Sequence, residues 1–417
     1  MSIYVSSEIH PLKKVIVHRP EEGISRISPH DSDVLLFDDI VHLPLMQQEH
    51  DIFTSVLKCF TGEDGVRDTE RLLVESLEVS KEGRASFLEM IIGFEELPPS
   101  WINKLLPLDN DTLARVLISG YLAKEDRYLF NPIPNFIFTR DIAITVKDYI
   151  IIAKANKSAR HRENLLTRFF LWYHPMFEEL RAHKRLINLN DLEKFPPNRN
   201  GEPVSVEGGD VMILFDDYLL VGVSERTTEH GFETLKQVIF ERGVVDYVVK
   251  VTIPKERSFM HLDTTFTQVD SRHFLGYKPL IIDGLSSNVT VFGKKGTERQ
   301  YSSVIEFLHT EIDPQIKVIP VGEGHSPFQE REQWTDAGNV VAVRPGVIIT
   351  YDRNPKTELA LKACGFDIIK AQEFLQQVQD GKLDPGSLDK TVITLPSTEL
   401  SRARGGSHCM TCPIWRE

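Results

Sequence analysis

The sequence contains few cysteines and no long apolar run. Only four cysteines occur among the 417 residues, too few for a disulfide framework, so we expect reduced thiols and a cytoplasmic location. No stretch of about 18 apolar residues is present, which argues against a transmembrane helix. The first residues, MSIYVSSEIHPLKKV, lack the basic segment and the apolar run that a signal peptide needs. The net charge of −13 disfavours nucleic acids and anionic membranes as partners.

Common phosphate, dinucleotide and metal motifs are also missing. The sequence has no GxxxxGK[ST] loop, no dinucleotide fingerprint after a strand and no HExxH. Its single CxxC begins at Cys409, and the other cysteines, Cys59 and Cys364, stand alone on helical stretches. A zinc site would need a second pair of ligands, so a metal or redox role is a minor alternative. We therefore expect no cofactor and no metal.

What the sequence does contain is a repeated unit. After Asp210, two strand segments, VMILF and YLLVGVS, stand on either side of a turn. A helical segment (HGFETLKQVIFERG) and a third strand segment (VDYVVKVTI) follow. The same order recurs after Asp141, after Asp263 and near Asp336, and LKKVIVHRP with the C-terminal segment can complete a fifth unit. Repeats of this size are typical of modules packed around an axis. The pattern predicts an α/β fold of ββαβ-type modules.

Two stretches interrupt this pattern. Residues 42–125 contain several segments with apolar residues at helical spacing, including LPLMQQEHDIFTSVLKCF, FLEMIIGF and TLARVLISGYL. We interpret them as a helical subdomain inserted into a catalytic domain formed by residues 1–41 and 126–417. Residues 373–396 predict a helix and a loop before the final motif.

Polar residues recur at the openings of the modules. They are Asp141, the segment 207–210, the segment 261–263 and Cys409. A single Asp before a strand is ordinary turn chemistry, but modules packed around an axis would bring all of these residues to one place. The recurrence therefore indicates a functional site.

Cys409 is the candidate nucleophile of this site. It follows the paired glycines of RGGSH, which let the backbone bend and approach a ligand closely. A cysteine nucleophile needs a general base or acid from elsewhere in the chain. We rank His261 first, because residues two apart in an extended strand share a face and His261 would then lie beside Asp263. His408, adjacent to the cysteine, ranks second.

Several motifs together resemble those of arginine deiminases, in the guanidino-group-modifying or pentein superfamily. They are PNFIFTRD ending at Asp141, EGGD (207–210), MHLD (260–263), RNPKT (353–357) and RGGSHCMTCP (404–413). The likeness begins with SSEIHPLKKVIVHRP and LLFDDI (35–40) and extends over nearly the whole chain. Each motif alone is weak, but the five in order are specific. The resemblance implies a five-bladed α/β propeller that hydrolyses L-arginine to L-citrulline and ammonia.

The resemblance also implies roles for individual residues. Cys409 would be the nucleophile, His261 the general acid and base, and Glu207 the carboxylate that supports the histidine. Asp141 and Asp263 would bind the substrate guanidinium, whose fixed fork of N–H donors suits paired carboxylates. The substrate's α-carboxylate and its remaining groups would be bound by Arg160, Arg226, Arg404, Asn135 and Phe138.

Other functions of the same residues stay open. An amidinotransferase would pass the amidino group to an amine instead of water, and a non-catalytic arginine-binding protein could keep the fold. Agmatine deiminase is less favoured because the arginines would have no carboxylate to bind, and chain length disfavours a methylarginine hydrolase. A homo-oligomer is compatible with the sequence. The glycine of the fourth module is shifted, to Gly338, and the segment 373–396 is longer than the resemblance leads us to expect.

Overall fold

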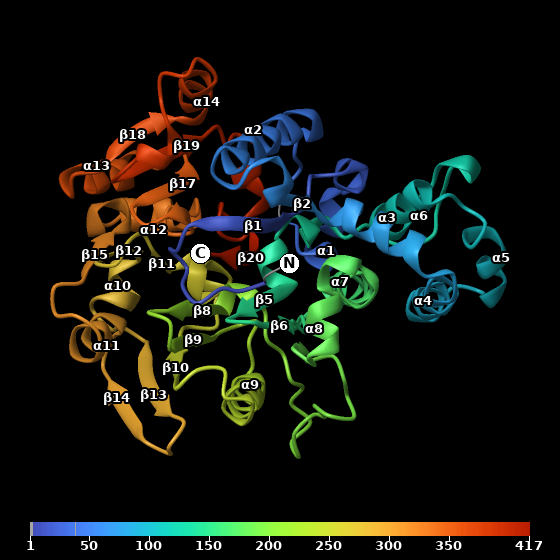
Figure 1. Cartoon of the computed structure of the whole chain (residues 1–417), viewed down its shortest axis with the longest axis horizontal. Helices are drawn as coiled ribbons and strands as arrows, with labels where there is room; N and C mark the ends of the chain where they lie inside the picture. The colour runs from blue at the N-terminus through green and yellow to red at the C-terminus, as the bar shows by residue number, and fades with distance from the viewer. Residues whose placement is uncertain (1–2, 38) are drawn as a thin grey trace.

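The protein has a mixed α/β fold built from small sheets. The computed structural model describes residues 3–37 and 39–417, without the side chain of Glu82, so Asp38 of the LLFDDI motif lies outside the described residues. Within these residues, five sheets share one arrangement, in which a middle strand pairs antiparallel with one neighbour and parallel with another. Figure 1 shows the sheets grouped together, with most helices outside them.

In each of these five sheets, the middle strand lies between a first strand, to which it is antiparallel, and a third strand, to which it is parallel. These trios are β5 (Ala143–Val146), β6 (Tyr149–Ile152) and β7 (Leu186–Asn188); β8 (Val211–Leu214), β9 (Tyr218–Val223) and β10 (Tyr247–Thr252); β11 (Phe266–Gln268), β12 (His273–Gly276) and β15 (Lys317–Pro320); β16 (Val341–Arg344), β17 (Val347–Tyr351) and β19 (Thr391–Leu395); and β20 (Cys412–Arg416), β1 (Leu12–Val17) and β2 (Val66–Asp68).

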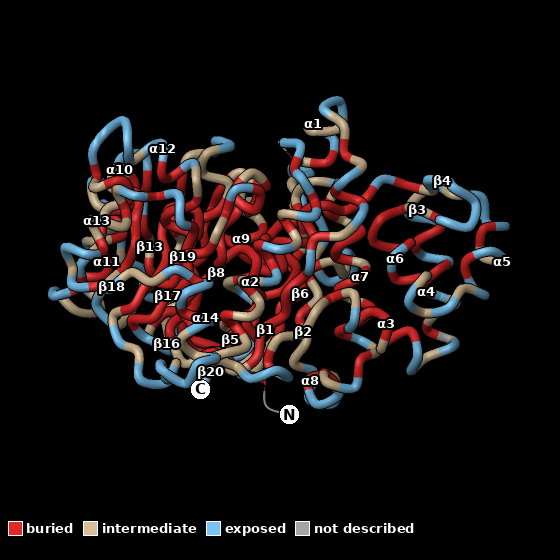
Figure 2. Tube along the Cα trace, turned by 90° about the horizontal axis from the view of Figure 1, so that it is seen from above, coloured by how far each residue is buried: buried red, intermediate tan, exposed pale blue. Residues whose placement is uncertain are grey.

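Helices connect each middle strand to its parallel partner. The connecting helices are α2 (Leu43–Thr61), α7 (His161–Tyr173), α8 (Glu178–Ala182), α9 (Glu229–Arg242), α10 (Lys278–Ile281), α11 (Val304–Glu311), α13 (Pro355–Ala363) and α14 (Ala371–Gln379). The middle strands are rich in buried Val, Ile and Leu, as expected for strands that are covered on both faces. Figure 2 shows this buried interior as the red segments at the centre of the sheets.

The first and last strands of the chain pair with each other. β1 and β20 are antiparallel neighbours, with Ile16 opposite Cys412, and Tyr4 forms a further bridge with Trp415. The prediction that LKKVIVHRP and the C-terminal segment form one unit is confirmed. β20 thereby fixes the segment that carries Cys409.

A helical region projects to one side of the sheets. It contains α3 (Thr69–Val79), α4 (Lys81–Phe94), α5 (Ile102–Leu105), α6 (Asn110–Ser119) and the short hairpin of β3 (Tyr121–Leu122) and β4 (Arg127–Tyr128). Figure 1 shows it at the right. Stacking of Phe87 on Phe169, with ring centroids 4.1 Å apart, joins α4 to α7. The short helix α1 (Ser32–Leu35) precedes α2 in the connection from β1 to β2, and α12 (Phe328–Trp334) lies between β15 and β16.

Helix α2 has a different partner from the one expected. The sequence analysis grouped it with the helical subdomain, but it connects β1 to β2, and its buried residues Met46, Phe53 and Val56 share a core with β17 and β19. Phe60 of α2 stacks on Phe374 of α14 at 5.6 Å. An apolar helical face does not by itself reveal which element it will cover. The helices that project from the sheets therefore begin at α3.

Two further parts of the sheets also differ from expectation. The segment 391–395, expected in a loop, is the fully buried strand β19 and lies between β17 and β18 (Asp367–Lys370). The hairpin of β13 (Asn288–Gly293) and β14 (Glu298–Tyr301) pairs with β10 and so extends the preceding module's sheet. None of the described helices has the length and apolar character needed to span a bilayer.

Candidate active site

The loops that precede the first strands of the sheets meet at a small cavity. Asp141, His261 and Cys409 line this cavity, each from a segment just before β5, β11 or β20. The remaining lining residues are Leu36, Asn135, Phe138, Arg160, Arg226, Arg257, Met260, Thr264, Ala403 and Arg404. Its volume of about 30 Å³ is close to the share of one water in the liquid, roughly 30 Å³. An arginine molecule therefore requires the lining side chains to move apart.

The Cys409 thiol lies between a carboxylate and an amide. Its Sγ is 3.5 Å from Oδ2 of Asp263 and accepts a hydrogen bond of 3.1 Å from Nδ2 of Asn339. The backbone N–H of Cys409 donates to Oδ1 of the same asparagine at 3.0 Å. Burial, together with the negative charges of Asp263 and Asp141, raises the pKa of the thiol well above its ordinary value. The thiol is therefore protonated at neutral pH while these charges are uncompensated.

His261 forms a buried ion pair with Glu207. Its Nε2 donates to Oε2 of Glu207 at 2.9 Å, and its Nδ1 is 3.7 Å from Oδ1 of Asp141. Burial lowers the pKa of His261, but the charge of Asp141 and the hydrogen bond to Glu207 outweigh burial and raise the pKa to about 10. Burial also opposes ionisation of Glu207, but its bond to His261 holds the pKa of the carboxyl well below its usual range. The imidazole is thus charged at neutral pH and can donate a proton.

The expected strand around His261 is a short turn instead. His261 has extended backbone angles, but residues 262–264 form a 3-10 turn. The turn is held by the side chain of Asp210, whose Oδ1 accepts from the backbone N–H of Leu262 at 2.9 Å. Burial raises the pKa of Asp210 to about 7. The reason given for placing His261 and Asp263 together was wrong, although both contribute to this region of the molecule.

Arg160 is surrounded by carboxylates. Its NH1 donates to Oδ2 of Asp141 at 2.5 Å and is 3.5 Å from Oε2 of Glu207, while its NH2 donates to Oε2 of Glu163 at 2.7 Å. NH2 also donates to the backbone oxygen of Asn135 at 3.1 Å. The exposed fraction of Arg160 is 4%, so it is a buried arginine and not a surface one.

The other predicted substrate-binding residues line the same cavity. Arg226 is buried, and its NH2 lies 3.6 Å from Sδ of Met260. The guanidinium of Arg404 stacks on Trp334, 3.2 Å from the ring centroid. Asn135 donates from Nδ2 to the backbone oxygen of Leu35 at 2.6 Å, and the Phe138 ring lies against Gly405.

The glycines of two motifs allow close approaches around this site. A Cβ on Gly208 would lie 1.8 Å from the backbone oxygen of Arg140, and one on Gly209 would lie 2.8 Å from the His261 ring. A Cβ on Gly405 would lie 2.3 Å from the Phe138 ring. Real Cβ atoms do not approach so closely, so EGGD and RGGSHC are motifs of packing as well as of chemistry.

Behind Asp263 lies a second buried network. Nδ1 of His408 is 2.8 Å from Oδ2 of Asp263, and Nε2 accepts from NH2 of Arg140 at 2.8 Å. Arg140 also donates to Oε2 of Glu8 at 2.8 Å. Although burial opposes it, the positive charge of Arg140 holds the pKa of Glu8 well below its usual range. His408, the second-ranked base, therefore holds Asp263 and does not line the cavity.

Asn339 and Glu163 contact the predicted site residues but were not predicted from the sequence. Asn339 makes two bonds to Cys409 and donates from Nδ2 to the backbone oxygen of Asp263 at 3.1 Å. It lies just before β16, so the opening of the fourth module contributes a polar residue as the other openings do. That equivalence was the available indication. The sequence contained no comparable indication for Glu163, because a glutamate in the first turn of a helix is common.

One group of site residues has the atoms of a metal site. Ligand atoms of Asp141, Glu207 and His261 lie within 4.8 Å of one another. However, the Arg160 guanidinium already binds both carboxylates and brings a positive charge to them. His261 uses Nε2 on Glu207, and its raised pKa of about 10 keeps the ring protonated. The donor set therefore suits a guanidinium cation better than a metal ion.

Solved structures show the fold to which this site belongs. The chain is similar to SxtG, an amidinotransferase from Microseira wollei, with a TM-score of 0.54, 14% identity and coverage of 100% of this chain and 97% of that chain. It is also similar to the product-bound N-terminal domain of ArgZ, an arginine dihydrolase of cyanobacteria, with a TM-score of 0.51, 13% identity and 97% coverage of both chains. The chain shares the fold of these two proteins.

Sequence comparison specifies the family. The arginine deiminase family model matches residues 112–416. The arginine deiminase of Bacillus thuringiensis subsp. konkukian (strain 97-27) is 33% identical over 445 residues, which cover 100% of this chain and 98% of that protein. The arginine deiminase of Listeria monocytogenes serotype 4b (strain CLIP80459) is 32% identical over 443 residues, with the same coverage. The chain belongs to the arginine deiminase family.

Proposed function

We propose that this protein is an arginine deiminase, which hydrolyses L-arginine to L-citrulline and ammonia without a cofactor. The observation that carries the proposal is that a thiol and a protonated imidazole line one cavity together with a carboxylate. The curated relatives, which are named arginine deiminases and match the whole chain, support the same reaction.

In this proposal, Asp141 and Asp263 accept hydrogen bonds from the substrate guanidinium. Carboxylates buried without a cation are costly, and a guanidinium with several N–H donors compensates them. Arg160, Arg226 and Arg404 bind the α-carboxylate of arginine. Asn135 and Phe138 contact its backbone groups and its aliphatic chain.

The reaction has two stages. In the first, the Cys409 thiolate attacks the guanidinium carbon, a C–S bond forms, and a C–N bond breaks while His261 gives its proton to the departing ammonia. In the second, His261 takes a proton from water and the water oxygen bonds to the same carbon of the thiouronium intermediate. The C–S bond of the adduct then breaks, the hydroxyl proton passes to the sulfur, and citrulline is released. Covalent catalysis divides one difficult step into two, and acid–base help typically adds about 10²–10⁴-fold.

The bound substrate also activates the thiol. The negative charges of Asp263 and Asp141 raise the pKa of Cys409. A guanidinium held between these carboxylates offsets their charge, so the thiol loses its proton more readily when substrate is present. The nucleophile is then formed at the time it is needed.

The proposed function also implies how the sheets and helices are organised. We interpret the five sheets as the blades of an α/β propeller around the cavity, and helices α3–α6 as an inserted subdomain. The repeated strand order of the sheets supports the first interpretation, and the separate position of the helices in Figure 1 supports the second. A reaction that needs a reduced Cys409 agrees with a cytoplasmic location.

Replacing the nucleophile tests the reaction. Cys409→Ala should abolish ammonia and citrulline formation and leave arginine binding measurable by isothermal titration calorimetry. The matched control is Cys364→Ala, because Cys364 is half-buried at the end of α13 and does not line the cavity. Substantial turnover by Cys409→Ala would refute the assignment.

A substrate panel separates this function from the alternatives. Purified protein should form citrulline from L-arginine, and not deiminate agmatine or methylarginines at a comparable rate. Assays with and without glycine or ornithine should give no new guanidino product. Such a product would favour an amidinotransferase, and tight arginine binding without citrulline would favour a binding protein.

A further inference from the structure

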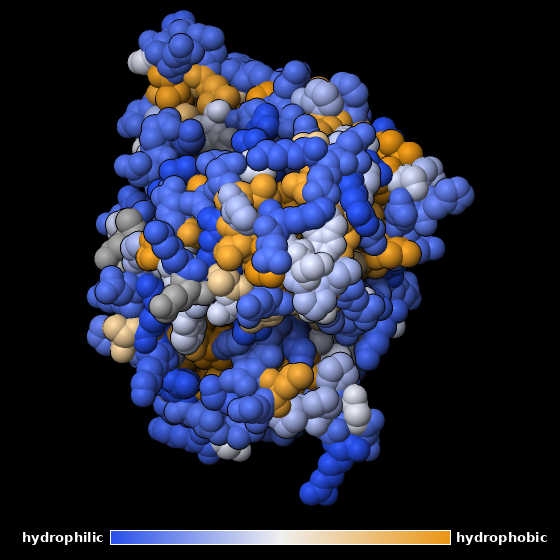
Figure 3. All heavy atoms as spheres, turned by 90° about the vertical axis from the view of Figure 1, so that its right-hand side faces the viewer, coloured by the Kyte–Doolittle hydropathy of each residue, from blue (hydrophilic) through white to orange (hydrophobic). Residues whose placement is uncertain are grey.

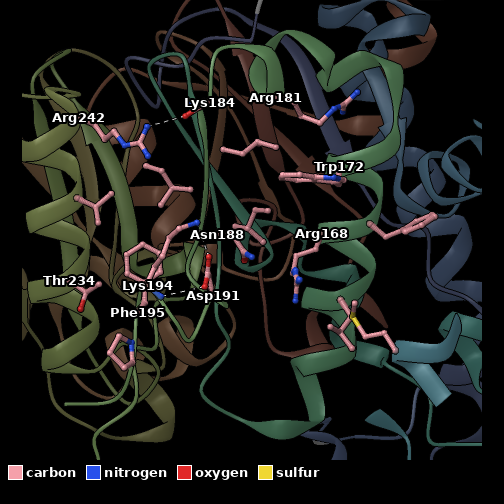
Figure 4. A pocket seen from close by; sticks show the side chains of 18 of the residues that line it. Arg168, Trp172, Arg181, Lys184, Asn188, Asp191, Lys194, Phe195, Thr234 and Arg242 are labelled. Carbon is pink, nitrogen blue, oxygen red and sulfur yellow. Dashed lines mark hydrogen bonds and ion pairs between the residues drawn. The ribbon is translucent and has the colours of Figure 1, made fainter. Parts of the chain in front are cut away.

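A large cleft lies between helices α7 and α9. Its volume is about 990 Å³, and its walls come from α4, α7, β7, the loop 191–197 and α9. Figure 4 shows it from close by, and Figure 3 shows a hollow with hydrophobic atoms on the side of the molecule that carries α3–α6. Small-molecule sites usually measure about 300–1,000 Å³. None of the residues predicted for the active site lines this cleft.

The lining of the cleft is positively charged, although the whole chain has a net charge of −13. Five basic residues line it, against two acidic ones, Asp191 and Glu241. The basic residues are Arg168, Arg181, Lys184, Lys194 and Arg242. On an acidic protein, such a local excess of positive charge selects for an anion.

Arg168 is available to bind that anion. Arg242 donates to the backbone oxygen of Lys184 at 3.1 Å, and Lys194 pairs with Asp191 at 2.9 Å. In the part of the chain that the structure describes, by contrast, no hydrogen bond or ion pair joins the half-buried Arg168 to another residue, and only the charge of Asp191 acts on it from farther away. Its forked donors suit the oxygens of a phosphate or carboxylate.

An aromatic platform accompanies this cation. Trp172 lies four residues after Arg168 on α7, hence on the same helical face, and 58% of its surface is exposed. Figure 4 shows both side chains projecting from α7, with Phe195 across the cleft. An exposed indole beside a free guanidinium favours a ligand with a flat ring and an anionic group. The several separated cations favour more than one negative charge.

Helix α7 connects the cleft to the active site. It begins at His161, directly after Arg160, and Glu163 in its first turn binds the Arg160 guanidinium at 2.7 Å. A ligand on Arg168 and Trp172 would therefore contact the same helix that holds Arg160 against Asp141. Rigid helices can transmit small displacements between sites.

We propose that the cleft between α7 and α9 binds an organic polyanion with a flat ring, such as a nucleoside triphosphate, and that its binding alters the affinity for arginine through α7. The ring lies on Trp172, and Arg168 binds an anionic group. The second half of the proposal rests on the proposed function, whereas the binding itself does not.

Calorimetry with the full-length protein tests the binding. ATP in metal-free buffer should bind saturably. Tripolyphosphate, which lacks the ring, and adenosine, which lacks the phosphates, should bind more weakly. Arg168→Gln should weaken ATP binding by about tenfold or more, as expected for loss of a charge-assisted contact. Arg199→Gln removes the same charge from an exposed position on the neighbouring loop, outside the lining, and should bind like the wild type. Trp172→Ala should weaken the binding of ATP and leave that of tripolyphosphate unchanged.

Each other outcome overturns a defined part of the proposal. The proposed site is refuted if ATP does not bind saturably or if Arg168→Gln binds ATP as tightly as the wild type. The contact of the ring with Trp172 is refuted if tripolyphosphate binds as tightly as ATP. ATP at a concentration near its wild-type Kd should change the KM for arginine in the wild type and change it much less in Arg168→Gln. An unchanged KM with measured ATP binding refutes the coupling through α7. Absence of citrulline formation in every sample would instead contradict the proposed function.

Discussion

At the scale of single residues, the site depends on mutual compensation of buried charges. Asp141 and Glu207 are buried acids that face the cations Arg160 and His261, and the buried Asp263 is bonded to His408. Breaking one member of such a pair leaves an uncompensated charge, which costs about 3–5 kcal/mol for a typical buried pair. Substitutions here therefore change pKa values as well as contacts.

Glu207→Gln should move the pH dependence of the reaction. Loss of the carboxylate charge lowers the pKa of His261 from about 10, so the imidazole loses its proton at a lower pH. The alkaline limb of the kcat/KM profile should shift down by about one unit or more. The control is Glu163→Gln, since Glu163 contacts Arg160 and not His261. An unshifted alkaline limb in Glu207→Gln would contradict the assignment of His261 as the acid.

The same pair should give a pH-dependent stability. Because folding raises the pKa of His261 from 6.5 to about 10, its contribution is fully present below pH 6.5 and is lost as the pH rises toward 10. Folding lowers the pKa of Glu207 from 4.5, so its contribution is lost only in acid. Urea unfolding between pH 6.5 and pH 10 should show this loss in the wild type and a smaller one in Glu207→Gln.

Asn339→Ala should make the thiol less reactive. The hydrogen bond from Asn339 lowers the pKa of Cys409, and without it the thiolate is scarcer. The substitution also leaves the backbone N–H of Cys409 without its acceptor, which costs about 1–3 kcal/mol. Alkylation of Cys409 by iodoacetamide at pH 8 should slow, and kcat should fall by about tenfold. Asn190→Ala, remote from the cavity, serves as control, and faster alkylation of Asn339→Ala would contradict the role.

The candidate residues were predictable where a motif marks them. The strings around Asp141, His261 and Cys409 lie on loops that line the cavity, and Glu207 binds His261, whereas Arg353 does not line the cavity. The partners of these residues were not predictable. Whether Arg160 binds Glu163, or His408 binds Asp263, depends on the approach of loops far apart in sequence.

At the scale of elements, the positions of strands in the sequence were easier to predict than the elements with which they pair or pack. The alternation in 211–223 predicted β8 and β9 correctly. The strand β19 was missed because TVITL follows a turn-rich stretch, DGKLDPGSLDK, that predicts a loop. The partner of α2 was missed because its amphipathic face fits any apolar surface. Pairing and packing partners are decided by tertiary contacts.

A helix cap at the junction between the sheets and the helical region offers a test at this scale. Asp68 ends β2 and caps α3, accepting from the backbone N–H of Glu70 at 2.8 Å and of Arg19 at 2.9 Å. Asp68→Ala should lower the free energy of unfolding by about 1–2 kcal/mol and leave kcat unchanged. Asp68→Asn keeps one acceptor oxygen for the N–H of Glu70, loses the bond from Arg19, and should lose less stability than Asp68→Ala. Equal losses in both variants would show that the cap is not the cause.

At the scale of the whole molecule, one sheet joins strands from the two ends of the chain. β1 pairs with β20, and Glu8 contacts His408 across 400 residues of sequence. Contacts between distant segments form late, because closing a long loop is entropically costly. After dilution from urea, citrulline formation should return more slowly than the far-ultraviolet circular dichroism signal. Simultaneous return would contradict this order of assembly.

The enclosed position of Cys409 also bears on the durability of the protein. Peroxides oxidise thiolates far faster than thiols, and Cys409 is only 4% exposed, with a pKa that burial raises. The resting protein thus protects its most important sulfur without a dedicated reductant. That protection ends when a cation enters the cavity, so the working protein is more easily damaged by oxidants than the idle one.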